Sequence, residues 1–313
     1  MTDRMHPGEI QIDDGLVRAL LARQFPQWAA LPLARVESSG TVNAMFRLGD
    51  QLAVRLPLVE NGAASIGREA EWLPKLGRQL DGQPYRRPGG QVAGSSLRAR
   101  IPRVVGVGAA AADYPCPWLV VEWLPGAAPA LGSEPGADAL ARDLGAFVCA
   151  LRRVGTADAP SGYRGGALHP LDDAVHDCLG QVEDLVDVAA LARLWDESLS
   201  AAPWAGAPVW THGDLLAANL LVADQRLSAV LDFGAAGIGD PACDVMAAWG
   251  VLPASARDVF RRAIGADDVM WLRGRGWALS QAAIALPYYR ETNPGMTASS
   301  LHILTELMSG EHS

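Results

Sequence analysis

A short hairpin pattern interrupts a long helical region of the sequence and limits the folds that this chain can adopt. Between Asn219 and Asp232, two apolar runs flank the polar pair Asp224-Gln225, which predicts two strands joined by a tight turn. Adjacent strands lie about 4.8 Å apart, so the hairpin brings the Asn219 amide and the Asp232 carboxylate together at its open end. Oxygen ligands of this kind suit Mg²⁺. Asp214, five residues before Asn219, would then lie beside the metal as a carboxylate able to accept a proton from a hydroxyl.

The composition excludes several classes of protein. The 313 residues are half apolar and only 19% charged, which indicates a large buried core and, from the length, two lobes around a shared cleft. Lys75 is the only lysine, so the chain has neither a G-x-x-x-x-G-K-[ST] phosphate loop nor a spare lysine for Schiff-base chemistry. The patterns H-E-x-x-H and G-x-S-x-G are absent, which removes the usual signatures of zinc proteases and α/β-hydrolases. The net charge of −9 argues against a general nucleic-acid partner.

The sequence also favours a cytoplasmic protein with no membrane partner. Its longest stretch without Asp, Glu, Lys or Arg, 198–213, has 16 residues and is too short and too broken by prolines for a membrane span. The N-terminus shows no apolar segment of a signal peptide. The four cysteines are far apart and form no C-x-x-C pair, which fits reduced thiols rather than a disulfide framework or a structural zinc site.

The spacing of apolar residues predicts an α+β protein whose two lobes meet near Pro125-Gly126. We expect residues 1–123 to form a strand-rich, nucleotide-binding lobe. Residues 124–313 should form a helical lobe with the catalytic loop, the metal site and the acceptor pocket. In the first lobe the expected elements are a helix over 11–28, three strands over 33–58, a helix over 63–80 kinked or ended by Pro74, an exposed loop over 81–100, and strands over 101–108 and 119–124. The second lobe is expected to be helical over 137–199 and 240–308 and strand-like over 209–233.

The most specific motif spans residues 212–244. The pattern H-x-D-x-x-x-x-N, followed by D-F-G, is similar to the catalytic and metal-binding loops of the protein-kinase-like fold. With Gly213 as the second residue of the motif and Asp240-Pro241 downstream, the chain resembles the aminoglycoside phosphotransferase family of small-molecule kinases. Only residues 235–239 separate D-F-G from Asp240-Pro241, which leaves no room for an activation loop or a peptide platform. The acceptor should therefore be small.

The resemblance implies a bilobal, kinase-like fold and gives roles to the motif residues. Asp214 is the implied catalytic residue, which orients and deprotonates the hydroxyl, while Asn219 and Asp232 hold Mg²⁺. The implied supporting residues are His212, Asp240 and Asp244. Structural interpretations stay open for them, because a buried histidine can brace the loop and an aspartate before a helix can cap it.

The first lobe gives independent support for the resemblance. Leu52-Ala53-Val54-Arg55 stands where V-A-I-K is expected, and strand alternation puts Ala53 and Arg55 on one face, toward the cleft. Arginine replaces the usual lysine, as in the macrolide-kinase-like and choline-kinase-like branches of this fold, and it can still pair with nucleotide phosphates. Glu69 is its expected carboxylate partner, with Glu71 as the alternative, and a surface salt bridge is the structural alternative for Arg55. The residues implied in nucleotide binding are Ser39, Gly40, Ala53, Arg55, Glu69, Glu122, Trp123 and Leu124.

Two other patterns are weaker signals. Residues 106–111 imitate a dinucleotide-binding G-x-G-x-x-A, but Asp113-Tyr114-Pro115 ends any following helix after about one turn, so the structural context is missing. The five arginines between Arg86 and Arg103 could bind nucleic acid or membrane, although a solvated insertion is the interpretation that we prefer.

The sequence therefore predicts a Mg²⁺-dependent enzyme that transfers the γ-phosphoryl group of ATP or GTP to a hydroxyl of a small molecule, as a monomer or weak dimer. Residues 134–197 hold twelve acidic residues against five arginines, a net charge of −7, which favours a cationic acceptor such as an aminoglycoside and hence a role in antibiotic resistance. An apolar pocket for a macrolide-like ring is the alternative, and its candidate residues are Trp271, Trp277, Leu286, Tyr288 and Tyr289. Two further functions stay open: a metabolic kinase for a sugar, a choline-like amine or an amino alcohol, and a catalytically silent nucleotide-binding module.

Overall fold

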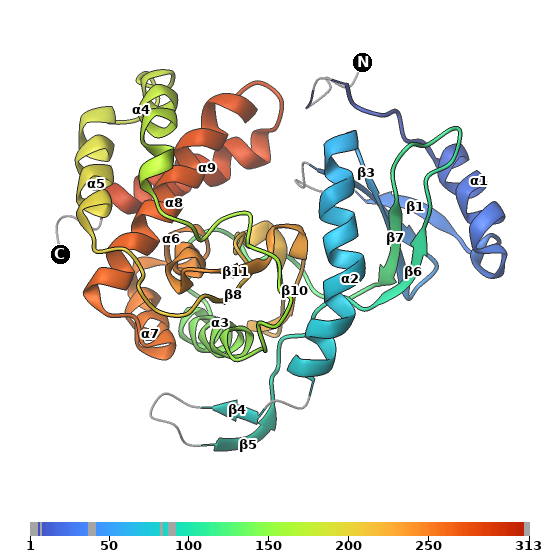
Figure 1. Ribbon diagram of the computed structural model, residues 1–313, viewed down its shortest axis with the longest axis horizontal. Helices are drawn as coiled ribbons and strands as arrows, with labels where there is room; N and C mark the ends of the chain where they lie inside the picture. The colour runs from blue at the N-terminus through green and yellow to red at the C-terminus, as the bar shows by residue number, and fades with distance from the viewer. Residues whose placement is uncertain (1–5, 7, 37–41, 82–83, 87–91, 310–313) are drawn as a thin grey trace. The chain divides into compact units, whose positions relative to one another are not determined.

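A five-stranded antiparallel sheet forms the centre of the first of two units. The computed structural model describes residues 6, 8–36, 42–81, 84–86 and 92–309. The first unit comprises Met1–Arg78, Arg100–Pro125 and Leu231–Gly234. Its strand order is β1-β2-β3-β7-β6. Figure 1 labels β1, β3, β6 and β7 of this sheet. The strands are β1 (Leu33–Val36), β2 (Asn43–Leu48), β3 (Leu52–Pro57), β6 (Val104–Gly108) and β7 (Trp118–Glu122).

The predicted three-strand meander is confirmed, because β1, β2 and β3 pair in sequence order and antiparallel. The two later strands are each shorter than predicted. β6 begins only after Pro102, which lacks the N–H that a ladder position needs, and β7 ends at Glu122, before Trp123 and Leu124.

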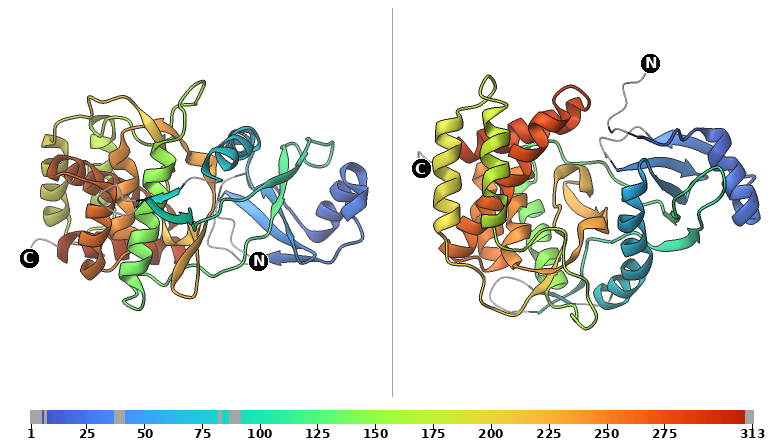
Figure 2. Two further views of the ribbon diagram at one scale, coloured as in Figure 1. Left: turned by 90° about the horizontal axis from the view of Figure 1, so that it is seen from below. Right: turned by 45° about the horizontal axis from the view of Figure 1, so that its top comes forward.

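Two helices bury opposite faces of this sheet (Figure 2). α1 (Asp14–Gln24) packs its leucines against the face that carries Val54 and Leu56. α2 (Ala63–Leu80) contributes Ile66 to the other face, where Ala53 is buried. The alternation predicted for β3 is therefore present, and it sets the orientation of Arg55, two residues after Ala53.

Both helices differ in detail from the sequence prediction. α1 is shorter than the predicted 11–28, because the side chain of Asp13 caps its first turn and Pro26 follows its end. α2 continues through Pro74, which neither ends nor divides it. The ring of Pro74 removes one backbone donor, and the packing of the helix on the sheet outweighs that loss.

The second unit is mainly helical and comprises Gln79–Ala99, Gly126–Val230 and Ala235–Ser313. Its helices are α3 (Ala137–Arg152), α4 (Asp172–Gly180), α5 (Val188–Ser200), α6 (Ala247–Gly250), α7 (Ala254–Ile264), α8 (Asp268–Tyr289) and α9 (Pro294–Ser309). Its strands form three pairs, β4 (Pro84–Arg86) with β5 (Val92–Ser96), β8 (Val209–Thr211) with β11 (Gly237–Gly239), and β9 (Leu220–Ala223) with β10 (Arg226–Val230). Among the described residues, no helix is both long and apolar enough to cross a membrane.

The β4–β5 pair corrects the prediction of an irregular loop over 81–100. Pro84 pairs with Ser96 and Arg86 with Val92, so the flanks of this Gly- and Pro-rich stretch form a hairpin. Composition predicts the turn residues of such a stretch but carries no information on whether its flanks pair.

The hairpin of β9 and β10 confirms the prediction of two strands between Asn219 and Asp232. Asp224 and Gln225 form the tight turn, with positive φ values of 50° and 59° that are typical of a two-residue hairpin loop. At the open end Val230 pairs with Leu220, which directly follows Asn219. Asp232 follows Val230 by two residues in the chain.

A buried carboxylate on α3 fixes this hairpin. Asp143 accepts two hydrogen bonds of 2.6 Å from the guanidinium of Arg226 in β10, and a third, at 3.3 Å, from the backbone N–H of Leu227. Its side chain is only 1% exposed. The contact thus connects the helical core to the strand that leads to D-F-G.

We expect Asp143→Ala to lower the free energy of unfolding by about 2–3 kcal/mol, because it removes a bidentate charged pair and leaves the Leu227 N–H without an acceptor. Urea denaturation measures this change. Asp138→Ala is the matched control on the same helix, since Asp138 is 59% exposed and only faces Arg142 at 3.7 Å. Its change should stay within about 0.5 kcal/mol, and equal losses in the two variants would contradict the account of Asp143.

Candidate active site

Arg55 is the centre of a charged group inside the first unit. Its side chain is 7% exposed on β3, and Nη1 donates to Glu69 Oε1 of α2 at 2.6 Å. Its Nη2 lies 3.5 Å from Asp232 Oδ2. Glu69 also accepts the backbone N–H of Phe233 at 2.8 Å. The expected pairing with Glu69 is therefore present, whereas Glu71 pairs with the exposed Lys75.

The electrostatics of this group keep a cation in a buried position. Burial disfavours the charged guanidinium, but the carboxylates of Glu69 and Asp232 outweigh it and raise the pKa of Arg55 above its usual value. Burial raises the pKa of Glu69, and the charge of Arg55 opposes that rise. Arg55 is therefore a permanent, fixed positive charge next to Asp232.

Asp232 sits in a strained but supported conformation. Its φ of 59° is left-handed, and Oδ1 accepts the N–H of Gly234 at 3.3 Å. A side chain at Gly234 would collide with Ser65, because a Cβ there would lie 1.8 Å from Ser65 Oγ. The D-F-G turn thus needs its glycine, and it presents an Asp232 side chain that is 36% exposed.

In the second unit, three side-chain donors hold the carboxylate of Asp214. Arg164 Nη1 and Gln281 Nε2 donate to Oδ1 at 3.1 Å and 2.5 Å. Asn219 Nδ2 donates to Oδ2 and to the backbone oxygen of Asp214, both at 2.9 Å. Because its N–H groups face Asp214, Asn219 has its side-chain oxygen left to face a cation.

A second carboxylate braces the backbone of the same loop. Asp244 is fully buried and accepts the N–H groups of His212 at 3.0 Å and of Gly213 at 2.9 Å. Burial raises the pKa of Asp244, and these backbone bonds oppose that rise. The buried His212 accepts the N–H of Asp214 through Nδ1 at 3.3 Å. Both residues thus stabilise the loop conformation that carries Asp214.

Asp240 has the capping role that the sequence left open. Its side chain accepts the N–H of Ala242 at 2.9 Å and so caps the 3-10 helix Pro241–Met246. It also forms a buried ion pair with Arg273 of α8 at 2.6 Å. Asp240 therefore anchors the segment that positions Asp244.

Sequence reasoning missed Arg164 and Gln281. No motif contains either residue, and Arg164 reaches Asp214 from 50 residues away in the chain. Gln281 did leave a signal, because an amide in the apolar stretch 278–286 must either reach the surface or find a buried partner. In the structure it is buried, and its partner is Asp214.

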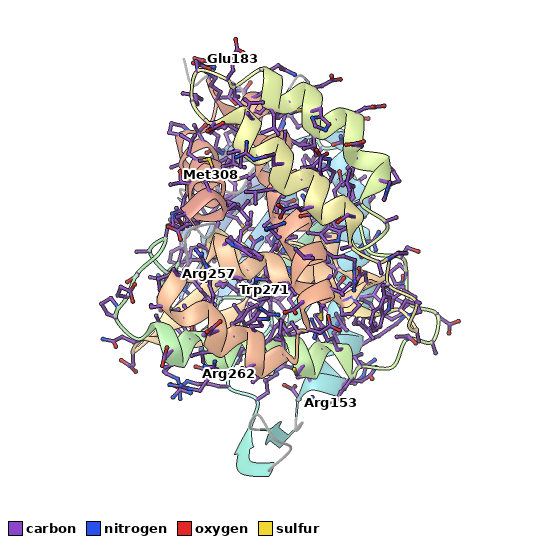
Figure 3. All side chains as sticks on the ribbon, turned by 90° about the vertical axis from the view of Figure 1, so that its left-hand side faces the viewer. Arg153, Glu183, Arg257, Arg262, Trp271 and Met308 are labelled. Atoms are coloured by element: carbon purple, nitrogen blue, oxygen red, sulfur yellow. The ribbon has the colours of Figure 1, made fainter. Side chains whose placement is uncertain are left out.

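The four aromatic residues predicted for the acceptor pocket lie in different surroundings. Trp277 is buried one helical turn before Gln281 on α8. Trp271, labelled in Figure 3, packs against Trp249 at 4.9 Å between ring centres, under Arg261. Ten residues separate it from Gln281, about 15 Å along a helix axis. Tyr288 is 51% exposed and meets the Tyr289 ring edge-on.

The residues predicted for nucleotide binding are mostly buried parts of the first unit. Ala53 is 2% exposed and Leu124 is 5% exposed. Glu122 pairs with Arg100 at 2.7 Å. The Trp123 N–H donates to the backbone oxygen of Gln51 at 2.7 Å, so it is not free to bind a base. Ser39 and Gly40 lie outside the described residues.

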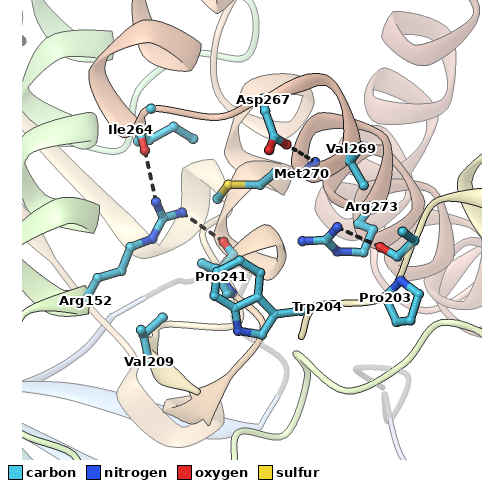
Figure 4. Close-up of a pocket in the computed structure, with 12 residues that line it drawn as sticks. Arg152, Pro203, Trp204, Val209, Pro241, Ile264, Asp267, Val269, Met270 and Arg273 are labelled. Carbon is cyan, nitrogen blue, oxygen red and sulfur yellow. Dashed lines mark hydrogen bonds between the residues drawn. The ribbon is translucent and has the colours of Figure 1, made fainter. Parts of the chain in front are cut away.

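The structure also has a cavity of about 380 Å³ in the second unit, lined by Pro241 and by residues of α7 and α8 (Figure 4). Arg152 lies along it and donates to the backbone oxygens of Pro241 at 2.9 Å and Ile264 at 3.2 Å. None of Asp214, Asn219 and Asp232 lines it. Within the described ranges, no three His, Cys, Asp or Glu side chains form a metal-binding group.

Comparison with known proteins gives the family. Residues 34–277 match the profile of the phosphotransferase enzyme family, so the chain belongs to this family. The predicted α+β, protein-kinase-like fold is confirmed, and so is the enzyme class, a phosphotransferase with an alcohol group as acceptor. A search of curated proteins found no match.

Solved structures of similar fold span nearly the whole chain. The GDP complex of wild-type aminoglycoside 2'-phosphotransferase-IIIa is 18% identical with a TM-score of 0.71, over 96% of this chain and 100% of that chain. The GDP and kanamycin complex of APH(2")-IIia is 18% identical with a TM-score of 0.68, over 95% and 99%. Macrolide 2'-phosphotransferase MphH from Brachybacterium faecium is 22% identical with a TM-score of 0.57, over 93% and 97%. At these identities the likeness shows the fold.

Proposed function

We propose that this phosphotransferase transfers the γ-phosphoryl group of ATP or GTP to a hydroxyl of a small hydroxylated antibiotic, with Asp214 as the catalytic residue. The observation that carries the proposal is the environment of Asp214. Three side chains from separate parts of the chain orient its carboxylate, and buried Asp244 fixes the backbone beside it. A carboxylate oriented in this way can align a hydroxyl for attack and accept its proton.

The residues present fit a magnesium ion. Asn219 turns its N–H groups to Asp214 and so has an oxygen available, and Asp232 adds a partly exposed carboxylate. Mg²⁺ takes oxygen ligands and usually retains several waters, so one carboxylate and one amide oxygen are a sufficient protein contribution. The bound ion neutralises negative charge on the phosphates. Asn219 and Asp232 are its proposed ligands, and Arg55 supplies further positive charge to the nucleotide.

The nucleotide base is proposed to lie at Glu122, Trp123 and Leu124, with Ala53 above it. The N–H groups of Glu122 and Trp123 are already used, whereas that of Leu124 has no backbone acceptor within the described part of the chain, so Leu124 is the proposed donor to the base. The GDP complexes among the structures of similar fold support a purine nucleotide as donor.

The acceptor is proposed to be an aminoglycoside-like polycation, with a macrolide as the second candidate. The net negative charge of residues 134–197 supports a cationic acceptor. Ion pairs in the structure reduce that charge. Arg226, Arg275 and Arg290, which lie outside this segment, pair with Asp143, Glu197 and Asp184 of it. The net charge therefore falls from −7 to −4 when these three arginines are counted. The buried Trp277 near Gln281 is the observation that favours a macrolide.

A salt titration tests the charge of the acceptor. We expect kcat/KM for an aminoglycoside to fall several-fold between about 0.01 M and 0.15 M ionic strength, because the Debye length shrinks from about 30 Å to about 8 Å. A macrolide with a single charge is the control and should respond much less. An aminoglycoside kcat/KM that does not change with salt would show that the acidic residues of 134–197 do not attract the acceptor.

Screening tests the function itself. The enzyme is incubated with ATP or GTP and, in turn, kanamycin, a macrolide, choline and a free sugar, and phosphorylated product is followed by mass spectrometry. A phosphorylated antibiotic is the expected result. Product with choline or the sugar alone would instead support a metabolic kinase, and nucleotide binding without any product would support a silent module.

A further inference from the structure

The catalytic loop, residues 212–219, contains no lysine or arginine. The four residues between Asp214 and Asn219 are Leu-Leu-Ala-Ala. The single lysine of the chain, Lys75, pairs with Glu71 on the surface of α2. Transfer of a phosphoryl group is accelerated chiefly by fixed positive groups around the moving charge, so a cation supplied from another part of the chain is of interest.

Arg164 is such a cation, and its side chain contacts the carboxylate of Asp214. It belongs to the segment between α3 and α4, and a single nitrogen, Nη1, donates both to Asp214 Oδ1 at 3.1 Å and to the backbone oxygen of Gly213 at 2.9 Å. Within the described ranges, no other arginine or lysine forms an ion pair with Asp214.

The rest of the guanidinium is available for a ligand. Its Nε and Nη2 donate to no acceptor in the part of the chain that the structure describes, and the side chain is 23% exposed. The group lies over the ring of Tyr163, 5.2 Å from its centre, and Tyr163 is 77% exposed. Arg164 thus has one nitrogen fixed on the catalytic carboxylate and two donor nitrogens left open.

Orientation of Asp214 does not by itself require this charge. Gln281 donates to the same oxygen as Arg164, and Asn219 holds the other oxygen. Both side chains are neutral amides, so they can orient Asp214 but cannot offset the negative charge of a phosphoryl group. The hydroxyl bound by Asp214 must lie within about 3–3.5 Å of the phosphorus that it attacks. A guanidinium on the same carboxylate is therefore within reach of the phosphoryl oxygens.

We propose that Arg164 is a catalytic residue, whose open donors bind the phosphoryl group while it is transferred. This inference rests on the proposed function. In the step, the acceptor oxygen forms a bond to the γ-phosphorus and its proton passes to Asp214. The bond from phosphorus to the bridging oxygen breaks, and its electron pair leaves with the nucleoside diphosphate. Arg164 donates to the non-bridging oxygens throughout, in the manner of an arginine finger supplied by the same chain.

Binding of a phosphoryl mimic tests this role without turnover. Affinity for ADP and for GDP is measured with Mg²⁺, in the presence and absence of fluoroaluminate. Fluoroaluminate should tighten binding to the wild-type enzyme, and Arg164→Gln should reduce that gain by about 10²-fold, the usual effect of one lost donor to such a group. Affinity for the diphosphate alone should not change, which also shows that the variant is folded.

Gln281→Leu is the matched control, because it removes the other donor to Asp214 Oδ1 but no positive charge. It should lower turnover through misplacement of Asp214 and leave the fluoroaluminate gain as in wild type. The proposal would be overturned if fluoroaluminate tightened diphosphate binding to Arg164→Gln as much as to wild type. It would also be overturned if Gln281→Leu lost as much of this effect as Arg164→Gln. Absence of any gain in the wild-type enzyme would overturn the proposed function as well.

Arg164→Lys provides a second variant if Arg164→Gln does not bind the diphosphate. Lysine keeps the charge but carries its three N–H donors on one nitrogen, so a lysine that holds Gly213 and Asp214 has one donor left for the phosphoryl group, where arginine has three. A reduced fluoroaluminate gain at unchanged diphosphate affinity supports the proposal. Fluoroaluminate that tightens diphosphate binding to Arg164→Lys as much as to wild type contradicts the proposal.

Discussion

Asp214→Asn is expected to lower kcat by about 10²- to 10⁴-fold while leaving nucleotide affinity within a small factor of wild type. Asparagine cannot accept the hydroxyl proton. Its single oxygen can still accept from Arg164 and Gln281, so the loop should keep its place. Asn219 loses the contact with Oδ2 but keeps its 2.9 Å bond to the backbone oxygen of residue 214. The variant therefore separates the effect on phosphoryl transfer from the effect on nucleotide binding.

Steady-state kinetics and nucleotide titration of the same preparation measure these two effects. Asp224→Asn is the control, because Asp224 is an exposed turn residue of the β9–β10 hairpin and its left-handed φ of 50° is one that asparagine adopts readily. It should keep wild-type kcat. If Asp214→Asn also keeps wild-type kcat, Asp214 is not the catalytic residue.

Asp232→Asn should weaken Mg²⁺-dependent nucleotide binding by about 10²-fold, equal to about 2.7 kcal/mol. The change removes the charge of the only carboxylate among the proposed metal ligands. Asparagine is preferred to alanine here, because the left-handed φ of 59° would add strain with alanine. Arg55 would also lose one of its two neutralising carboxylates.

Nucleotide titrations over a range of Mg²⁺ concentration test this expectation. Asp158→Asn is the matched control, since Asp158 is an exposed aspartate whose φ of 57° is left-handed like that of Asp232. The control should bind nucleotide as wild type does, with the same dependence on Mg²⁺. An Asp232→Asn variant with that same dependence would show that Asp232 does not bind the metal.

The parts of the fold that depend on local pattern could be predicted from the sequence. The hairpin followed from two apolar runs around Asp224-Gln225. Strand alternation put Arg55 on the same face as Ala53, and the resemblance to kinases gave Glu69 as its partner. Both depend on neighbours within about twenty residues. The lobe limits at residues 123 and 124, the site roles, cytoplasmic location and the oligomeric state remain predictions.

Features that depend on contacts distant in sequence could not be predicted. Arg164 has no periodic or motif signal, and only folding brings it to Asp214. Formal charge makes residues 134–197 strongly acidic, whereas in the structure Asp184 and Glu197 of this segment each pair with an arginine more than seventy residues away. Charge counted along the sequence therefore overestimates the field that an acceptor meets.

Transfer of labelled phosphate to an acceptor measures the proposed reaction itself. The wild-type enzyme and Asp214→Asn are each mixed with γ-³²P-labelled ATP or GTP, Mg²⁺ and kanamycin or a macrolide, and label in the acceptor is followed with time. We expect label to enter a hydroxyl of one of these acceptors with the wild-type enzyme, and to enter it at least about 10²-fold more slowly with Asp214→Asn. Equal rates of labelling by the two proteins, or no labelled acceptor with wild type despite tight nucleotide binding, would contradict this expectation.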